Sequence, residues 1–135
     1  MSMNARKSLP ILVACSLAAC VSHEGRYSPA CVAFEGSNVE LRGGQFVWEK
    51  FTDSVTVDDD GEVVNQFPGY PMQGSYRIDG QTVTMESAAG DSLENMYLHQ
   101  SENRSYLLTA EQHKAWEETG KYADCALVRG GNSEN

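Results

Sequence analysis

The sequence is poor in basic residues. Its 135 residues include only 10 Lys and Arg against 19 Asp and Glu, which gives a formal net charge of −9 at neutral pH. A surface this acidic repels phosphate backbones and anionic lipid head groups. We therefore exclude nucleic acid as a partner.

The sequence also lacks a hydrophobic run long enough to cross a bilayer. The uncharged stretch from Ser8 to Ala19 has about a dozen residues, whereas a transmembrane helix needs roughly 20. This stretch follows Arg6 and Lys7 and ends in small residues, which is the pattern of an export signal that is removed. We expect residues 1–19 to be such a signal peptide.

A cysteine follows this segment directly. The residues Leu17-Ala18-Ala19-Cys20 resemble the lipobox of bacterial lipoproteins. The resemblance implies a lipid on the Cys20 thiol, cleavage before Cys20 and acylation of the new amino group. Several acyl chains hold a protein firmly to a membrane. Val21, in place of aspartate, points to the outer membrane, with the domain facing the periplasm.

Two alternatives to this anchor stay open. Leu12-Val13-Ala14-Cys15 also fits the lipobox pattern, but it leaves an apolar run of only about seven residues after Lys7. The second alternative is that the segment is an ordinary secretory signal and that a cysteine lies near the cleavage site by chance. Removal of Arg6 and Lys7 changes the net charge from −9 to −11, because every acidic residue lies after Cys20.

Only two cysteines, Cys31 and Cys125, lie in the expected domain. In an oxidising compartment two such cysteines are expected to pair, and this bridge would close nearly the whole domain into one loop. Metal ligation is the rival interpretation. A lone cysteine pair lacks the clustered partners that zinc requires, so we predict a disulfide and no metal.

The region between the cysteines alternates apolar and polar residues over many short segments separated by turn residues. This pattern predicts an antiparallel sandwich or barrel. Inward-facing rows are expected at Val39 with Leu41, at Phe46 with Trp48, and at Val55 with Val57. We expect a tether at residues 20–29, one domain at residues 30–129 and a disordered tail at residues 130–135.

Two hairpins and one helix are predicted within this domain. Asp79-Gly80 is a hairpin signal between alternating segments, and Leu93 to His99 forms a second pair with Arg104 to Leu108. Thr109 and Gln112 have the spacing of a capping box, and Gly120 ends the helix that they begin. Trp116 is expected to pack this helix onto the end or flank of the barrel.

The order of these elements resembles the up-and-down meander barrels of the lipocalin-like group. The segment from Gly74 to Met85 is similar to a hairpin common in small lipocalin-like lipoproteins. The first-strand Gly-x-Trp signature of true lipocalins is absent. The resemblance implies a fold class, a mainly β meander barrel with one short helix near the C-terminus, and no particular ligand.

Few residues are candidates for chemistry. Asp58 to Glu62 does not follow the calcium-loop pattern and predicts a solvated hairpin tip. His23, His99 and His113 lack metal-ligand spacing and are expected at the surface or at strand edges. No Gly-x-Ser-x-Gly nucleophile motif occurs. We therefore predict no catalytic residue, no cofactor and no enzyme activity.

One loop is unusually apolar: aromatic residues and a methionine alternate with turn residues from Phe67 to Met72. Exposed, Phe67, Tyr70 and Met72 form a contact patch of the kind that marks binding sites. Folded over a barrel end, they form a hydrophobic plug, which is the favoured interpretation because small domains need their apolar side chains.

The functional hypotheses follow in order. The first is a non-enzymatic envelope lipoprotein that binds a small apolar ligand or a protein partner, through the barrel interior or the loop at Phe67 to Met72. The second is a structural or inhibitory lipoprotein with a filled barrel, which docks through its acidic surface onto a basic envelope protein. An enzyme is the third.

Overall fold

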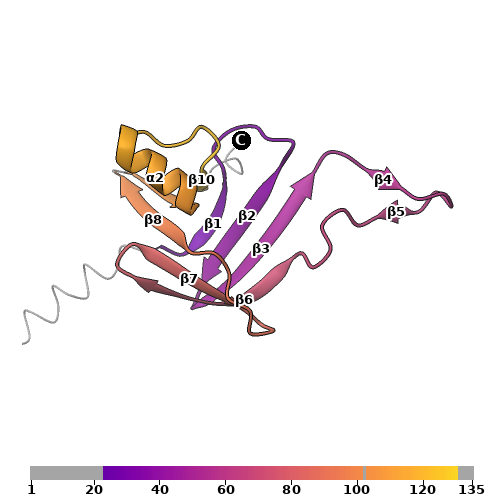
Figure 1. Ribbon diagram of the computed structural model, residues 1–135, viewed down its shortest axis with the longest axis horizontal. Helices are drawn as coiled ribbons and strands as arrows, with labels where there is room; N and C mark the ends of the chain where they lie inside the picture. The colour runs from indigo at the N-terminus through magenta and orange to yellow at the C-terminus, as the bar shows by residue number, and fades with distance from the viewer. Residues whose placement is uncertain (1–22, 102, 131–135) are drawn as a thin grey trace, which may run out of the picture.

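The alternating segments of the sequence form a closed antiparallel barrel in the computed structural model, which describes residues 23–101 and 103–130 (Figure 1). Sequential strands are neighbours throughout, so the chain meanders around the barrel and the last strand pairs with the first. The predicted mainly β meander barrel is therefore confirmed. Its strands are β1 (Gly25–Pro29), β2 (Glu35–Arg42), β3 (Gln45–Thr52), β6 (Met72–Asp79), β7 (Thr82–Ser87), β8 (Met96–Ser101), β9 (Arg104–Leu108) and β10 (Leu127–Arg129).

Tight turns join the hairpins at one end of the barrel, here called the turn end. Gly43 and Gly44 link β2 to β3, and both have positive φ, +59° and +79°, as a two-residue hairpin loop requires. The hairpin predicted at Asp79-Gly80 is confirmed as β6–β7, with Gly80 at φ +65° and Asp79 paired with Thr82.

The other predicted hairpin, β8–β9, is also confirmed. Its first strand begins at Met96 rather than Leu93.

Side chains fill the interior of the barrel. The central group is no more than 3% exposed, and partly buried residues of β3, β6 and β8 pack against it. Gly74 is required in this wall, because a Cβ there would lie 2.0 Å from the Glu86 carbonyl oxygen and 2.8 Å from the Phe46 ring. The eight central residues are Tyr27, Val39, Leu41, Phe46, Val83, Met85, Met96 and Leu107.

The turn end is closed by the residues that lead into β1. The His23 Nε2 atom is hydrogen-bonded to the Tyr76 hydroxyl at 2.7 Å. The Tyr27 hydroxyl donates a hydrogen bond to the His23 carbonyl oxygen at 2.5 Å. The Gly43 amide donates to the Glu24 carboxylate at 2.7 Å. Burial raises the pKa of Tyr27 to about 12, so its hydroxyl keeps its proton and remains a donor.

The prediction of a tether at residues 20–29 was wrong for its second half. Gly25–Pro29 is β1, which pairs with both β2 and β10. Its Tyr27 is fully buried. The segment has a single large apolar side chain, and the pairing of its backbone on both sides, rather than its composition, makes it a strand. The domain therefore begins before residue 30.

The remaining boundary predictions concern the two ends of the chain. Gly130, expected in the tail, donates its amide to the Arg26 carbonyl oxygen at 3.0 Å. The signal peptide, Cys20 and residues 131–135 lie outside the described residues. Within the part that is described, no helix has the length and apolar character needed to span a bilayer.

The helix α2 (Ala110–Thr119) lies beside the outer face of β8 and β9 (Figure 1). The predicted capping box is present: the Thr109 hydroxyl accepts from the Gln112 amide at 3.1 Å, and the Gln112 side chain accepts from the Thr109 amide at 3.1 Å. Gly120 ends the helix with φ +74°. Because the apolar face is narrow, no residue of α2 is fully buried.

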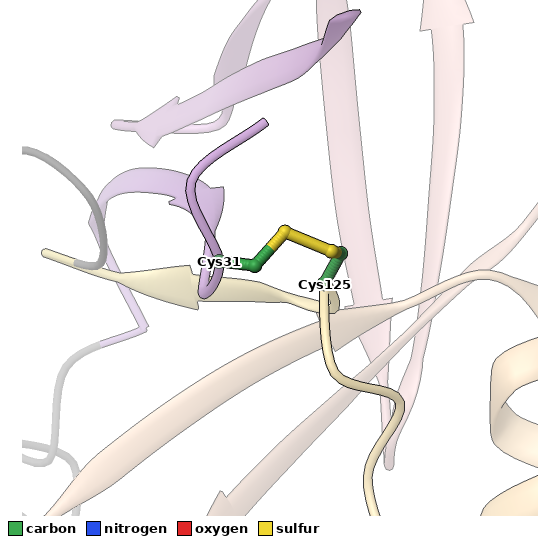
Figure 2. The surroundings of a disulfide bond; sticks show 2 residues. All are labelled: Cys31 and Cys125. Atoms are coloured by element: carbon green, nitrogen blue, oxygen red, sulfur yellow. A yellow bond between two sulfur atoms is a disulfide. The ribbon is translucent and has the colours of Figure 1, made fainter. Parts of the chain in front are cut away.

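The predicted disulfide joins Cys31 to Cys125 across the seam where the barrel closes (Figure 2). Cys31 follows β1 and Cys125 precedes β10, and these strands share only three residue pairs. The Ala30 amide continues the ladder with a bond of 2.9 Å to the Ala126 carbonyl oxygen. The cross-link thus holds together the first and last strands, whose cysteines are 94 positions apart.

Replacing both Cys31 and Cys125 by serine should lower the free energy of unfolding by roughly 2–4 kcal/mol, because the long closed loop restricts the unfolded chain. Denaturant unfolding of the oxidised protein and the double variant measures the difference. Equal midpoints, with the bridge verified in the parent protein by thiol alkylation, would contradict the prediction.

Candidate functional site

The chain between β3 and β6 leaves the barrel and forms a projecting two-stranded arm, residues 54–66 (Figure 1). Its strands are β4 (Thr56–Val57) and β5 (Val63–Val64), which pair only with each other. The arm emerges where β3 ends at Thr52, opposite the turn end. This side of the barrel is here called the arm end.

Four valines of the arm are exposed to solvent. Val55, Val57, Val63 and Val64 have exposed fractions between 41% and 73%. Two further large apolar residues, Val32 and Phe34, are exposed at the arm end, and the Phe34 carbonyl oxygen accepts from the Asp53 amide at 2.9 Å. Val57 and Val63 are cross-strand partners, so the arm presents paired exposed valines, and exposed apolar side chains gathered on one element are typical of an interaction site.

The expected inward-facing row at Val55 and Val57 was therefore wrong. These residues have the right alternation, but β4 pairs only with β5 and does not join the barrel sheet. Alternation marks the two faces of a strand, and the face is buried only where another layer covers it. The rows at Val39 with Leu41 and at Phe46 with Trp48 are packed in the barrel as predicted.

The tip of the arm is a preorganised acidic turn. The Asp58 carboxylate accepts from the backbone amides of Asp60 and Glu62, each at 2.9 Å. Two further backbone bonds of 2.9 and 3.0 Å close the turn, in which Gly61 has φ +85°. Asp59, Asp60 and Glu62 are all exposed, so the tip concentrates negative charge at a fixed position. The hairpin tip predicted for Asp58 to Glu62 is present.

The apolar loop at Phe67 to Met72 forms the base of the arm. Phe67, Tyr70 and Met72 are all half-buried. The Tyr70 ring meets the edge of Trp48 with 6.5 Å between ring centres, and the Lys50 ammonium lies 5.0 Å from the Tyr70 ring centre. Met72 is the first residue of β6 and packs against the core. These contacts fix the direction in which the arm leaves the barrel.

Replacing Tyr70 and Met72 together by serine should lower the free energy of unfolding by roughly 2–4 kcal/mol, since both side chains pack against barrel residues. Denaturant unfolding measures the loss. The exposed control Val63→Ser should stay within about 0.5 kcal/mol of the parent. A double variant as stable as that control would identify the loop as a surface that contributes little to the core.

A cluster of aromatic and histidine side chains joins α2 to the outer barrel wall. The His99 Nε2 atom on β8 lies 2.8 Å from the His113 Nδ1 atom on α2. His113 stacks on Tyr97 with 4.3 Å between ring centres, and Trp116 meets His99 edge-on at 4.4 Å. Trp116 therefore packs α2 onto the flank of the barrel, one of the two places predicted for it.

The expectation that the histidines lie at the surface or at strand edges was wrong for His99, which is 3% exposed. The sequence separates His99 and His113 by 14 positions, and only the docking of α2 on β8 brings them together. Burial, and then the neighbouring His113, lower the pKa of His99, while Glu117 opposes this shift. The His113 Nε2 atom lies 3.5 Å from the Glu117 carboxylate.

Because the pKa of His99 is lowered in the folded state, the unfolded protein binds more protons than the folded protein when the pH falls below the ordinary histidine value of 6.5. The stability contributed by neutral His99 is complete above pH 6.5 and is lost below it. We expect unfolding free energy to fall between pH 7 and pH 5, by at most about 1.4 kcal/mol per pH unit for one proton. His99→Phe should flatten this slope, and an unchanged slope would contradict the assignment.

Among residues 23–101 and 103–130, no three His, Cys, Asp or Glu side chains are grouped so that they could hold a metal ion. The structure instead brings together an apolar arm with an acidic tip, at the end of the barrel opposite the chain's first described residues. Comparison with protein-family models, with curated proteins and with solved structures gives no significant match.

Proposed function

We propose that this chain is a lipid-anchored envelope protein that binds another protein through its arm, residues 54–66. The observation that carries the proposal is the exposure of Val55, Val57, Val63 and Val64 on an element that contributes nothing to the barrel wall. Burying these valines would be favourable, and the isolated domain leaves them in contact with water. A binding partner that covers them explains why the arm is held away from the barrel.

The filled interior supports a docking function over the binding of a large apolar ligand. Eight central side chains that are at most 3% exposed occupy the space that a ligand would need. Barrels of eight strands have interiors just wide enough to be filled in this way. The proposal therefore corresponds to the filled-barrel hypothesis, with the arm in place of a general acidic surface.

The position of the arm suits a protein anchored at Cys20. His23, three positions after Cys20, is bonded to Tyr76 at the turn end. Three extended residues span about 10 Å, so a lipid on Cys20 would hold the turn end close to the membrane. The arm leaves the opposite end of the barrel, near Thr52, and would point away from that membrane.

The chemistry of the arm defines the partner. Its valines require an apolar groove, and the carboxylates of Asp59, Asp60 and Glu62 require basic residues at the border of that groove. The chain has 19 acidic and 10 basic residues, and this negative net charge attracts a basic protein over long distances. Complementary charge raises association rates and selects among partners more than it adds affinity.

The arm can be tested in the full-length protein in its own membrane. A photo-crosslinking residue at position 57 should give one dominant product with a basic protein, whereas the same residue at position 79 on the turn end should not. Products that are equally abundant at both positions, or absent at position 57, would contradict the proposal.

The identified partner then allows a quantitative test with purified proteins. Asp59→Asn, Asp60→Asn and Glu62→Gln combined should weaken binding about tenfold at low salt and reduce its dependence on salt. Val57→Ser with Val63→Ser should weaken it at all salt concentrations, while changing stability by less than about 0.5 kcal/mol. Thr84→Ser, on the barrel wall, is the matched control and should bind normally.

The anchor is tested separately. Cys20→Ser should release the protein from the membrane fraction or leave it unprocessed, because the acylated thiol is lost, and Cys15→Ser should not. Intact-protein mass spectrometry and fractionation distinguish the two. Normal acylation of Cys20→Ser, together with loss of acylation in Cys15→Ser, would move the anchor to the earlier cysteine.

A further inference from the structure

The arm end of the barrel contains a pocket that the docking function does not use. Its volume is about 240 Å³, and it lies between the end of β1, the segment leading into β2, and the start of α2. Its lining includes Ala33, Ser37, Trp48, Met96, Gln112 and Leu127. The pocket thus opens from the filled core toward the mouth of the barrel.

The Trp48 indole nitrogen is left without a hydrogen-bond partner in the described part of the chain. Its Nε1 atom is buried, and it is the one buried side-chain nitrogen or oxygen there for which no partner is found. An indole N–H can only donate, and buried donors are nearly always paired. An acceptor is therefore the group that would satisfy this N–H, and Trp48 lines the pocket.

The remaining lining restricts the charge of a ligand. Leu127, Met96 and Ala33 present apolar surface, so most of the ligand must be apolar. Glu35 also lines the pocket, and its carboxylate disfavours an anion. No lysine or arginine lines the pocket, and the only group there that offsets this repulsion is the N-terminus of α2, at Thr109 and Gln112.

The volume restricts the size of a ligand. About 240 Å³ is the share of roughly eight water molecules in the liquid, at about 30 Å³ each. This is below the range of about 300–1,000 Å³ that is usual for drug-sized ligands. The pocket suits a molecule of about ten non-hydrogen atoms.

We propose that this pocket binds a small neutral apolar molecule whose carbonyl, ether or hydroxyl oxygen accepts a hydrogen bond from the Trp48 Nε1 atom. That atom is covered in this structure, so the proposed hydrogen bond requires a side chain of the pocket to move aside when the ligand enters. Met96 and Gln112 have long side chains and line the same pocket. A methionine side chain adapts readily to a change in the space around it.

The test uses the indole N–H signals in a nitrogen-15 correlation spectrum of the oxidised protein. The chain has two tryptophans, and Trp116→Phe assigns the Trp48 signal by elimination. Three probes of similar shape separate the contributions: cyclohexanone is neutral with an acceptor, methylenecyclohexane lacks the acceptor, and cyclohexanecarboxylate is anionic. Cyclohexanone should move the Trp48 proton signal downfield in a saturable way.

Methylenecyclohexane should produce a smaller shift without the downfield change, and cyclohexanecarboxylate should bind at least tenfold more weakly than the ketone. Glu35→Gln should reduce that tenfold difference. Ala33→Leu fills the pocket and should abolish the response to the ketone while leaving the Trp116 signal in place. The proposal is overturned if no probe gives a saturable shift, if ketone and hydrocarbon act equally, or if Ala33→Leu responds as the parent does.

Discussion

The closure of the barrel between β1 and β10 is the constraint on which the other features depend. The two strands share three residue pairs, and they come from opposite ends of the domain, so no turn of the chain holds them together. The Cys31–Cys125 bridge holds them together at the arm end. Cys125 also lines the pocket beside Trp48, and the chain after Cys31 carries Ala33 and Glu35 into its wall. Closure of the seam therefore shapes the mouth of the barrel.

The two ends of the barrel have different chemistry because the strands enter and leave in different ways. At the turn end, short glycine turns join the strands directly, and hydrogen bonds of His23 and Glu24 attach the segment before β1 to them. At the arm end, β3 does not turn directly into β6, and the intervening residues form the arm. Tyr70 and Met72 attach the base of the arm to the barrel. The proposed recognition surfaces lie together at the end remote from the proposed anchor.

The sequence predicted the parts of the fold that local rules control. The β6–β7 hairpin at Gly80, the capping box at Thr109 and the disulfide each depend on residue types at short spacing or on a single possible pairing. The predictions from sequence were wrong for Gly25–Pro29, expected in the tether, and for Val55 with Val57, expected to face inward. Burial at both places is decided by strand pairing across the domain. The predictions also missed the His99–His113 contact, which needs the docking of a helix on a strand. The arm was only partly foreseeable, from its acidic turn.

The helix α2 connects the outer wall of the barrel to its pocket. Its first turn lines the pocket through Gln112, and the next residue, His113, bonds His99 on the outer wall. No residue of the helix is fully buried, so these few contacts and the ring of Trp116 carry most of its attachment. His99 is therefore linked through His113 to the helix that forms one side of the pocket. One wall of the pocket is thus formed by a helix that is attached to the barrel through contacts on the barrel's outer face.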